Sequence, residues 1–193
     1  MIHTSTQPIR NGRSCGHRAE RGFTLVELMV TIVVAAVLMS IAIPSFKHIT
    51  ASTRLTTVSN NLVNALNTAR MEAIKRNSDT QFCANAGNGA DTLGTACNNQ
   101  LGAVYAETGS VGAPVAALVL APAASVPPSV HFSSIVALQF SAQGLAHQVG
   151  STGPYTGTVA SICSSAIDSG NQRIISMTTG SILATATSTG ACP

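Results

Sequence analysis

One uninterrupted apolar run, from Phe23 to Ile43, constrains this chain of 193 residues more than any other feature. It holds about 21 residues, roughly 31 Å as an α-helix at 1.5 Å per residue, which is enough to cross the hydrocarbon core of a bilayer. Glu27 is the one charged residue inside it, and no other charge follows until Lys47. A carboxylate at the centre of a spanning helix costs roughly 2.5–3.5 kcal/mol on insertion scales. Glu27 therefore needs an explanation.

The positive charge of the chain lies at its N-terminal end. Residues 1–22 carry four arginines against one glutamate, a net charge of +3, and residues 23–77 also carry a net +3. Residues 78–193 hold one cation, Arg173, against four carboxylates, a net −3. The positive segment before the apolar run is expected to stay cytoplasmic, which sends the C-terminal part of the chain outward. A distal domain of net negative charge argues against a general nucleic-acid-binding surface.

Apolar residues continue at steps of three and four beyond the run. We call this set the Leu/Val stripe: Leu55, Val58, Leu62, Leu66, Ala69 and Ala73. The spacing predicts one helix from Phe23 to about Arg76, with the stripe packed against the distal domain. Pro44 falls inside this helix, where a proline removes one backbone hydrogen bond and is expected to kink it.

Short strands replace the helical spacing after Asn77. Charged residues make up only 9% of the chain, and small and polar residues dominate this part, which suits an extracytoplasmic β-rich domain. Clusters of Gly, Pro, Ser and Asn separate the predicted strands. These strands are Thr80–Ala84, Leu101–Glu107, Val115–Leu120, Val130–Phe132, Val136–Ser141, Thr158–Cys163, Arg173–Met177 and Ser181–Thr187.

The sequence GFTLVE at residues 22–27 resembles the class III signal of type IV pilins and type II secretion pseudopilins. The resemblance implies that a prepilin peptidase cuts between Gly22 and Phe23 on the cytoplasmic face, and that the new N-terminal amine of Phe23 is methylated. It also implies that Glu27 compensates the N-terminal amine of a neighbouring subunit during assembly, because opposite charges attract strongly in a low-dielectric layer. The alternative is a glutamate near a helix end that snorkels to the membrane surface.

The rest of the chain resembles the globular domain of the GspH/FimT family. The resemblance rests on LNTARMEAIKRN, a cysteine-bearing strand, LGAVYAE, LQFSAQG and RIISMTTGSI, which together cover most of residues 62–187. It implies a pilin-like α+β fold, in which a long N-terminal helix packs on a C-terminal antiparallel β-sheet domain. The implied parts are a cleaved leader (1–22), a transmembrane half of the helix (23–46), an amphipathic half (47–77) and a periplasmic or extracellular domain (78–193).

Four cysteines remain after Cys15 leaves with the leader: Cys83, Cys97, Cys163 and Cys192. An even number in a chain exported to an oxidising space indicates disulfides, and three pairings are possible. We favour a Cys83–Cys97 bridge, which closes a loop of about 15 residues and is worth about 3 kcal/mol in the chain-entropy model. Its companion, Cys163–Cys192, pins the C-terminal tail.

Three classes of function are compatible with this chain, and the first is a structural subunit. Such a subunit is a FimT-like minor pilin of a type IV pilus or, alternatively, a GspH-like minor pseudopilin of a type II secretion system. The 22-residue leader and the Cys-bearing tail favour the pilus. The expected partners are a prepilin peptidase, other pilins or pseudopilins in a filament, and the inner membrane. The chain is then a single-pass inner-membrane protein with a periplasmic C-terminal domain.

The second class is a receptor for DNA uptake. DNA-binding FimT-type members carry a Gly-Arg-x-Arg stretch near the tail. The matching place here, residues 180–183, keeps Gly180 and lacks both arginines. Phosphate contacts from Lys and Arg supply most non-specific affinity, so no strong nucleic-acid binding is expected.

The third class is a membrane-anchored periplasmic enzyme. The sequence contains no H-E-x-x-H and no phosphate-cradling loop, and His131 and His147 are isolated. Zinc is disfavoured because no C-x-x-C occurs. The 85–98 loop holds Asn88, Asp91 and Asn98, whose oxygens suit calcium but are too few for a site. We expect no catalytic residue, metal, cofactor or small-molecule substrate.

Overall fold

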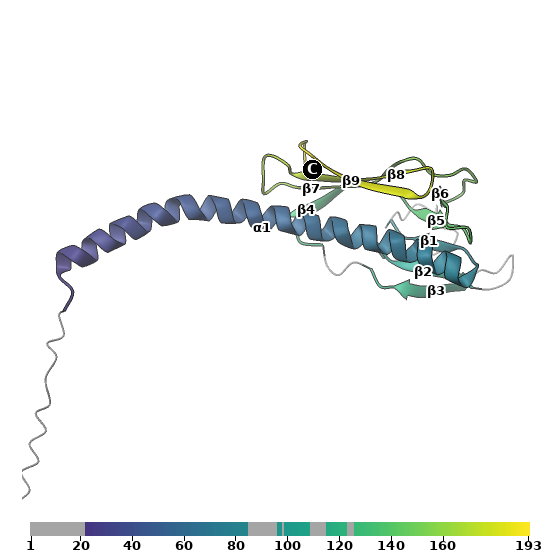
Figure 1. Cartoon of the computed structure of the whole chain (residues 1–193), viewed down its shortest axis with the longest axis horizontal. Coiled ribbons are helices and arrows are strands. Elements are labelled where there is room, and N and C mark those ends of the chain that lie inside the picture. The colour runs from purple at the N-terminus through teal and green to yellow at the C-terminus, as the bar shows by residue number, and fades with distance from the viewer. Residues whose placement is uncertain (1–21, 85–95, 98, 109–114, 123–125) are drawn as a thin grey trace, which may run out of the picture. The chain divides into compact units, whose positions relative to one another are not determined.

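The computed structural model describes residues 22–84, 96–97, 99–108, 115–122 and 126–193. The chain forms two compact units, Met1–Ala42 and Ile43–Pro193, and the single long helix contributes residues to both. The elements are, in chain order (Figure 1), α1 (Leu25–Arg76), β1 (Thr80–Phe82), β2 (Val104–Thr108), β3 (Val115–Leu120), β4 (Val130–Ile135), β5 (Leu138–Phe140), β6 (Ala146–Gln148), β7 (Gly157–Ser164), β8 (Gln172–Thr178) and β9 (Ile182–Ser188).

The strands form two antiparallel sheets within the second unit. One sheet has five strands in the order β3-β2-β1-β5-β6, and the other has four in the order β4-β7-β8-β9. Each described pairing is antiparallel. β1 is central in its sheet, because Gln81 pairs with Tyr105 of β2 on one side and with Gln139 of β5 on the other. The predicted α+β fold, a long helix with an antiparallel β-sheet domain, is confirmed.

The observed strands overlap the predicted ones, with differences at the ends of β2 and β4 and around β5 and β6. β2 begins at Val104 rather than at Leu101, and β4 ends at Ile135 rather than at Phe132. The predicted strand Val136–Ser141 is shorter in the structure, where β5 covers Leu138–Phe140, and β6 (Ala146–Gln148) is missing from the prediction. β6 has only three residues, AHQ, and no alternating apolar pattern marks it in the sequence. It is a strand because it pairs with β5, with Gln139 opposite His147.

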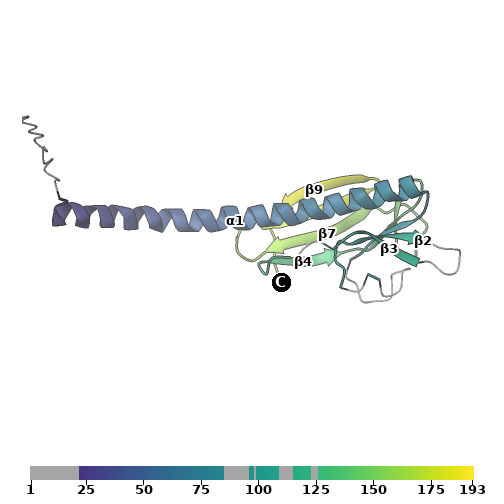
Figure 2. The ribbon, with the colours of Figure 1, turned by 90° about the horizontal axis from the view of Figure 1, so that it is seen from below.

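The Leu/Val stripe of α1 is buried, as predicted. Leu55, Leu66 and Ala69 are fully inaccessible to solvent. The stripe belongs to one apolar cluster that also holds Phe140 of the five-stranded sheet and Ile162 of the four-stranded sheet. Both sheets therefore share a core with the second half of α1, which lies along them (Figure 2).

The two sheets are joined at one end by backbone hydrogen bonds around Gly180, in the turn between β8 and β9. The N–H of Ala146 donates to the Gly180 carbonyl at 2.8 Å, and the N–H of Gly180 donates to the Tyr155 carbonyl at 2.7 Å. Gly180 has a φ of +67°, and a Cβ added there would lie 2.6 Å from the carbonyl oxygen of Ala146. Only glycine allows this approach.

Replacing Gly180 with alanine is therefore expected to destabilise the domain by about 2–4 kcal/mol, from left-handed backbone strain and from overpacking against Ala146. Gly150 is a matched control, because its φ is +82° and a Cβ there would meet nothing within 4 Å. Gly150→Ala should lower the free energy of unfolding only through left-handed backbone strain, by about 1 kcal/mol. Urea unfolding of the full-length protein in detergent, followed by circular dichroism, measures both. Equal losses would show that the β8–β9 turn moves away from Ala146 without cost.

Candidate processing and assembly site

Gly22 and Phe23 lie directly before the first turn of α1. Both residues are exposed, Phe23 to 79%, and no atom lies within 4 Å of the position of a Cβ on Gly22. The peptide bond predicted to be cut joins these two residues, and the described part of the chain leaves it open to a peptidase. Residues 1–21 of the predicted leader lie outside the described residues.

Thr24 caps the N-terminus of α1. Its hydroxyl oxygen accepts a hydrogen bond from the backbone N–H of Glu27 at 3.2 Å, and its carbonyl accepts the N–H of Leu28 at 3.2 Å. Thr24 and Glu27 thus occupy the N-cap and N3 positions, the T-x-x-E spacing of a capping box. A carboxylate in the first turn also interacts favourably with the partial positive charge of the helix N-terminus. Glu27 therefore contributes to the helix start in two ways. Its backbone N–H binds the Thr24 hydroxyl, and its charge interacts with the helix N-terminus.

The large apolar side chains between Leu25 and Ile43 are exposed on all sides of the helix. The most apolar window of 18 residues has a mean hydropathy of 2.6, and none of it is buried within the chain. Among the described residues, α1 is the one helix that is long and apolar enough to cross a membrane. An exposed apolar surface of this size is typical of a segment that contacts a membrane or another protein.

α1 continues without interruption through Pro44. The kink expected at Pro44 stays a prediction. Beyond it, the hydroxyl groups of Thr50 and Thr53 donate to the carbonyls of Phe46 and Ile49, four residues earlier, at 2.9 and 2.8 Å. These bonds satisfy the threonine hydroxyl groups within the helix.

Two disulfides are present, and their pairing is the one that the sequence favours. Cys83, just after β1, is bonded to Cys97, with 5.3 Å between the Cα atoms. Cys163 of β7 is bonded to Cys192, with a Cα separation of 5.6 Å. Both separations lie in the usual range for disulfides.

Hydrogen bonds reinforce the attachment of the tail. The Asn171 side chain donates to the Gly190 carbonyl at 2.9 Å and accepts the Gly190 N–H at 3.1 Å. The Gln172 side chain donates to the Ala191 carbonyl at 3.0 Å. Together with the bond to Cys192, these contacts hold the last residues against β7 and β8.

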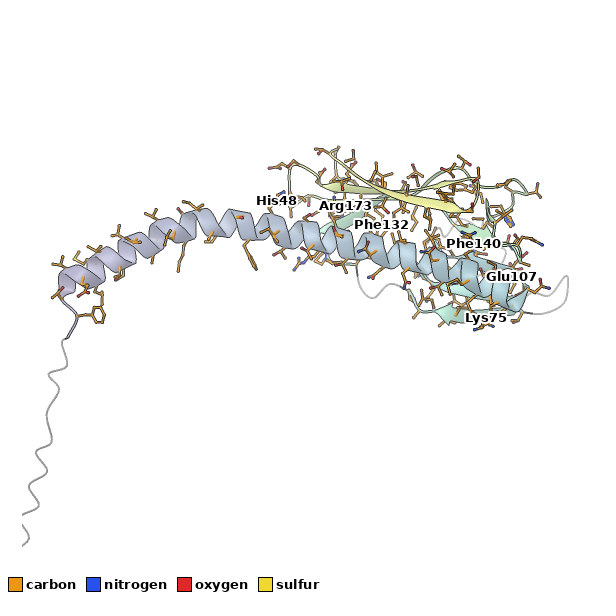
Figure 3. The ribbon with its side chains drawn as sticks, viewed as in Figure 1. His48, Lys75, Glu107, Phe132, Phe140 and Arg173 are labelled. Carbon is orange, nitrogen blue, oxygen red and sulfur yellow. A yellow bond between two sulfur atoms is a disulfide. The ribbon has the colours of Figure 1, made fainter. Side chains whose placement is uncertain are left out.

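Arg173, the one Lys or Arg in the sequence after Arg76, makes its hydrogen bonds within the domain (labelled in Figure 3). It is half-buried, and its guanidinium donates to the carbonyls of Gly170 and Gln172 at 2.8 and 3.0 Å. A third hydrogen bond reaches the Ser52 hydroxyl of α1 at 3.2 Å. Its donors are thus largely used within the chain.

Three cations in the last turns of α1 also have partners. Arg70 donates a hydrogen bond to the carbonyl of Ser181, the residue just before β9, at 3.1 Å. Glu72 forms ion pairs with Arg76 at 2.7 Å and with Lys75 at 3.2 Å. Hydrogen bonds from Arg76 and Lys75 hold the pKa of the Glu72 carboxyl below its usual value.

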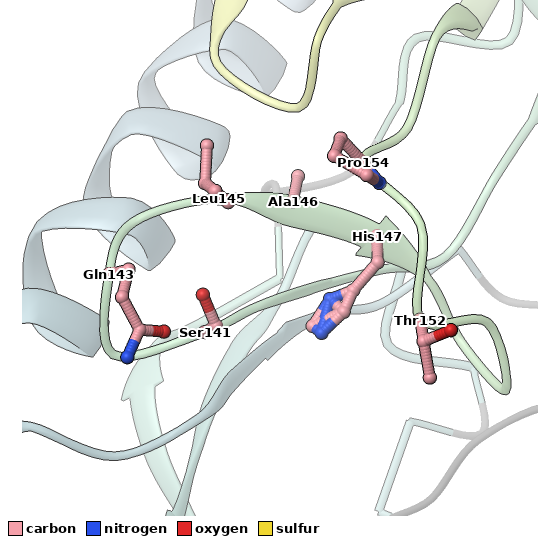
Figure 4. A pocket seen from close by; sticks show the side chains of 7 residues that line it. All are labelled: Ser141, Gln143, Leu145, Ala146, His147, Thr152 and Pro154. Carbon is pink, nitrogen blue, oxygen red and sulfur yellow. The ribbon is translucent and has the colours of Figure 1, made fainter.

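A groove of about 260 Å³ places Ser141 and His147 together beside β6 (Figure 4). The His147 Nδ1 atom lies 3.1 Å from the carbonyl oxygen of Gln139. Over the described residues, no hydrogen bond joins Ser141 to His147, and no carboxylate lines the groove. A serine nucleophile is activated by a hydrogen bond to its base, and the described groove has no such bond between Ser141 and His147.

The structure gives no support for a metal site in the ranges that it describes, where no three His, Cys, Asp or Glu residues lie close enough to share an ion. Asn88, Asp91 and Asn98, the residues considered for calcium, lie outside the described residues. His131 sits within β4, opposite Cys163 of β7, and His147 within β6, opposite Gln139 of β5. The two histidines therefore belong to different sheets.

Two family models match the chain. The prokaryotic N-terminal methylation motif matches residues 17–43, which contain Gly22, Phe23 and Glu27. The family described as Type II transport protein GspH matches residues 58–181, more than half of the chain. The chain belongs to the GspH family. The GspH match starts at Val58, within the Leu/Val stripe, and ends at Ser181, just before β9, so it covers most of the packed half of α1 and the strands β1 to β8.

Two fimbrial proteins of Pseudomonas aeruginosa are also similar to this GspH-family chain. Each is 42% identical over 57 residues, which is 30% of this chain and 36% of the relative. The match therefore spans about a third of the length of these curated relatives. No solved structure matches the chain.

The Thr24 N-cap, in a T-x-x-E spacing, is a feature of this GspH-family chain that the sequence analysis missed. A threonine or serine followed three residues later by an acidic residue, just before an apolar run, is a recognised helix-start pattern. Thr24 and Glu27 satisfy it. The inward contacts of Arg173 had no such signal, because Ser52 lies 121 residues away in the sequence.

Proposed function

We propose that this GspH-family chain is a FimT-like minor pilin, a structural and assembly subunit of a type IV pilus. The observation that carries the proposal is the start of α1, where an accessible Gly22-Phe23 bond precedes a capped helix with an exposed apolar surface. The methylation motif covers this region, and the similarity to fimbrial proteins favours a pilus.

On this proposal, a prepilin peptidase removes residues 1–22 and Phe23 becomes the methylated N-terminus. Residues 23–46 anchor the chain in the inner membrane as a single span, and residues 78–193 form a periplasmic domain. During assembly, the apolar face of α1 leaves the lipid and is covered by the helices of neighbouring pilins. Glu27 then compensates the N-terminal amine of the adjacent subunit.

A minor pseudopilin H of a type II secretion system is the second candidate. The matching family carries a type II transport description, and the same helix start serves both kinds of filament. Deleting the gene separates the two functions. Loss of surface pili with normal protein export supports the minor pilin, and retained pili with loss of exported proteins from the medium supports the pseudopilin.

A DNA-uptake receptor is disfavoured. Ser181 and Leu183 stand where such receptors have their two characteristic arginines. The Arg173 guanidinium donates hydrogen bonds to groups of this chain. Few cations are then left on the domain for phosphate contacts, which supply most non-specific affinity for DNA.

The proposal is tested by replacing Glu27 with glutamine. Glutamine still fits the N3 position of a capping box, so the change removes the charge and keeps the helix start. We expect Glu27→Gln to insert into the membrane normally and to be at least about ten-fold depleted from sheared filaments, because the amine of the neighbouring subunit loses its partner in a low-dielectric layer. Immunoblots of membrane and sheared fractions measure both quantities.

Thr24→Val is the matched control, because it removes the capping hydroxyl and keeps the charge of Glu27. This variant should enter filaments close to the wild-type level. Normal incorporation of Glu27→Gln would favour the snorkelling alternative. Equal depletion of the two variants would mean that the helix start, rather than the charge, determines assembly.

A further inference from the structure

A pocket of about 230 Å³ lies beside α1 just after the apolar run ends. The helix contributes one wall, and the other comes from residues directly before β4 and in the turn after β7. The lining residues are Phe46, Lys47, Thr50, Ala51, Arg54, Ser129 and Ala166. All of them belong to the second unit, Ile43–Pro193.

Two cations flank this pocket from the same side of the helix. Lys47, Thr50 and Arg54 are three and four residues apart, so their side chains share one face of α1. Lys47 and Arg54 are exposed, and neither makes a hydrogen bond or ion pair with any residue that the structure describes. No carboxylate is found among the described lining residues. The pocket is therefore electrostatically suited to an anion.

The rest of the lining is mostly apolar and contains one unsatisfied donor. Phe46 is 71% exposed at the pocket, and Ala51 and Ala166 add further carbon surface. The hydroxyl oxygen of Ser129 is buried and has no hydrogen-bond partner in the described structure. A buried hydroxyl without a partner is costly, and a ligand oxygen would satisfy it.

The position of the pocket along α1 identifies the kind of anion. Lys47 comes four residues after Ile43, about 6 Å along the helix, and Arg54 follows about 10 Å later. The headgroup layer is roughly 5–8 Å deep on each side of a bilayer. Lys47 therefore falls within this layer, and the Arg54 side chain, which shares its face and points toward the helix N-terminus, reaches back toward it. A ligand that joins a phosphate to a hydrocarbon chain would match both the cations and the apolar lining.

We propose that this pocket binds the headgroup phosphate of an anionic phospholipid in the leaflet next to the folded domain. Lys47 and Arg54 donate to the phosphate oxygens, the Ser129 hydroxyl donates to a third oxygen, and Phe46 contacts the glycerol and upper acyl carbons. The inference deepens the proposed function, since it rests on residues 23–46 anchoring the chain in a bilayer. The bound lipid would hold the membrane-bound subunit at one depth before assembly.

Short-chain lipids test the proposal on the full-length protein in a non-ionic detergent. The probes are dihexanoyl phosphatidylglycerol, dihexanoyl phosphatidylcholine and inorganic phosphate, and native mass spectrometry or calorimetry measures their binding. We expect phosphatidylglycerol to bind at least about ten-fold more tightly than phosphatidylcholine, because only the former leaves its phosphate charge uncompensated. Inorganic phosphate should bind more weakly than phosphatidylglycerol, because it has no carbon to place against Phe46.

The double variant Lys47→Gln/Arg54→Gln should lose at least about ten-fold in affinity for phosphatidylglycerol. The double variant Lys75→Gln/Arg76→Gln is the matched control, since it removes the same charge from the other end of the described α1. It should bind like the wild type. Ser129→Ala, which leaves the charge unchanged, should weaken binding several-fold. Circular dichroism verifies that each variant is folded.

Four results would overturn the proposal: equal binding of the two lipids, equal binding of inorganic phosphate and phosphatidylglycerol, equal losses in the two double variants, or no binding of any probe. The second of these would indicate a site for a free anion. The last would leave the two cations available to an acidic surface of another subunit. None of these outcomes depends on filament formation, so the lipid site and the pilin assignment can fail separately.

Discussion

A chain shortened to residues 78–193 is expected to be unfolded or aggregated, whereas one that begins at Ser52 is expected to be a soluble, folded monomer. The longer form lacks the membrane-spanning residues and keeps the Leu/Val stripe, which completes the core against both sheets. The shorter form loses every stripe residue, including the fully buried Leu55 and Leu66. Truncating one buried leucine costs about 2–5 kcal/mol, and losing the whole stripe exceeds the total stability of a typical domain, about 5–15 kcal/mol.

Thermal unfolding by circular dichroism and size-exclusion chromatography compare the two forms. Equal unfolding temperatures would show that α1 contributes nothing to the stability of the sheets. A pair of point variants in the longer form tests the same packing with a smaller expected loss of stability. Leu66→Ala should lower the free energy of unfolding by about 2–5 kcal/mol, and the exposed neighbour Asn67→Ala should change it by less than about 0.5 kcal/mol.

Gly22→Val is expected to abolish removal of the leader. The wild-type protein should be isolated from membranes with Phe23 at its N-terminus, whereas the variant should retain residues 1–22. A branched side chain replaces a bare Cα beside the bond to be cut, where the described structure has open space and the peptidase must approach closely. Intact mass and N-terminal sequencing measure the outcome, which is close to all-or-none.

Gly16→Val is the control for Gly22→Val, because it makes the same substitution inside the leader at a distance from the cut. It should be processed normally. A mature N-terminus between residues 35 and 50 in the wild type would instead indicate an ordinary secretory signal, and the pilin assignment would then be wrong.

The helix and its packing could be predicted from sequence because both depend on local spacing. The steps of three and four from Leu55 to Ala73 extend over five turns, and a pattern of that length is hard to produce in any other element. The Cys83–Cys97 pairing was favoured for a similar reason, because the two residues flank one short loop.

Features that depend on distant residues could not be predicted. Gly180 must be a glycine because of the Ala146 carbonyl, which is supplied by a different sheet. β6 exists because β5 offers it a partner, and Arg173 turns inward because α1 presents Ser52 to it. In each case the deciding group belongs to an element that becomes a neighbour only after folding.

The attachment of the tail has a mechanical consequence. β9 is the last strand and lies at the edge of its sheet, where tension on a free C-terminal end would peel it from β8 one hydrogen bond at a time. The Cys163–Cys192 bond bypasses β8 and carries that load directly to β7, the strand between β4 and β8. A subunit built in this way resists unzipping for as long as the bond stays oxidised, and reduction turns its outermost strand into the weakest point under strain.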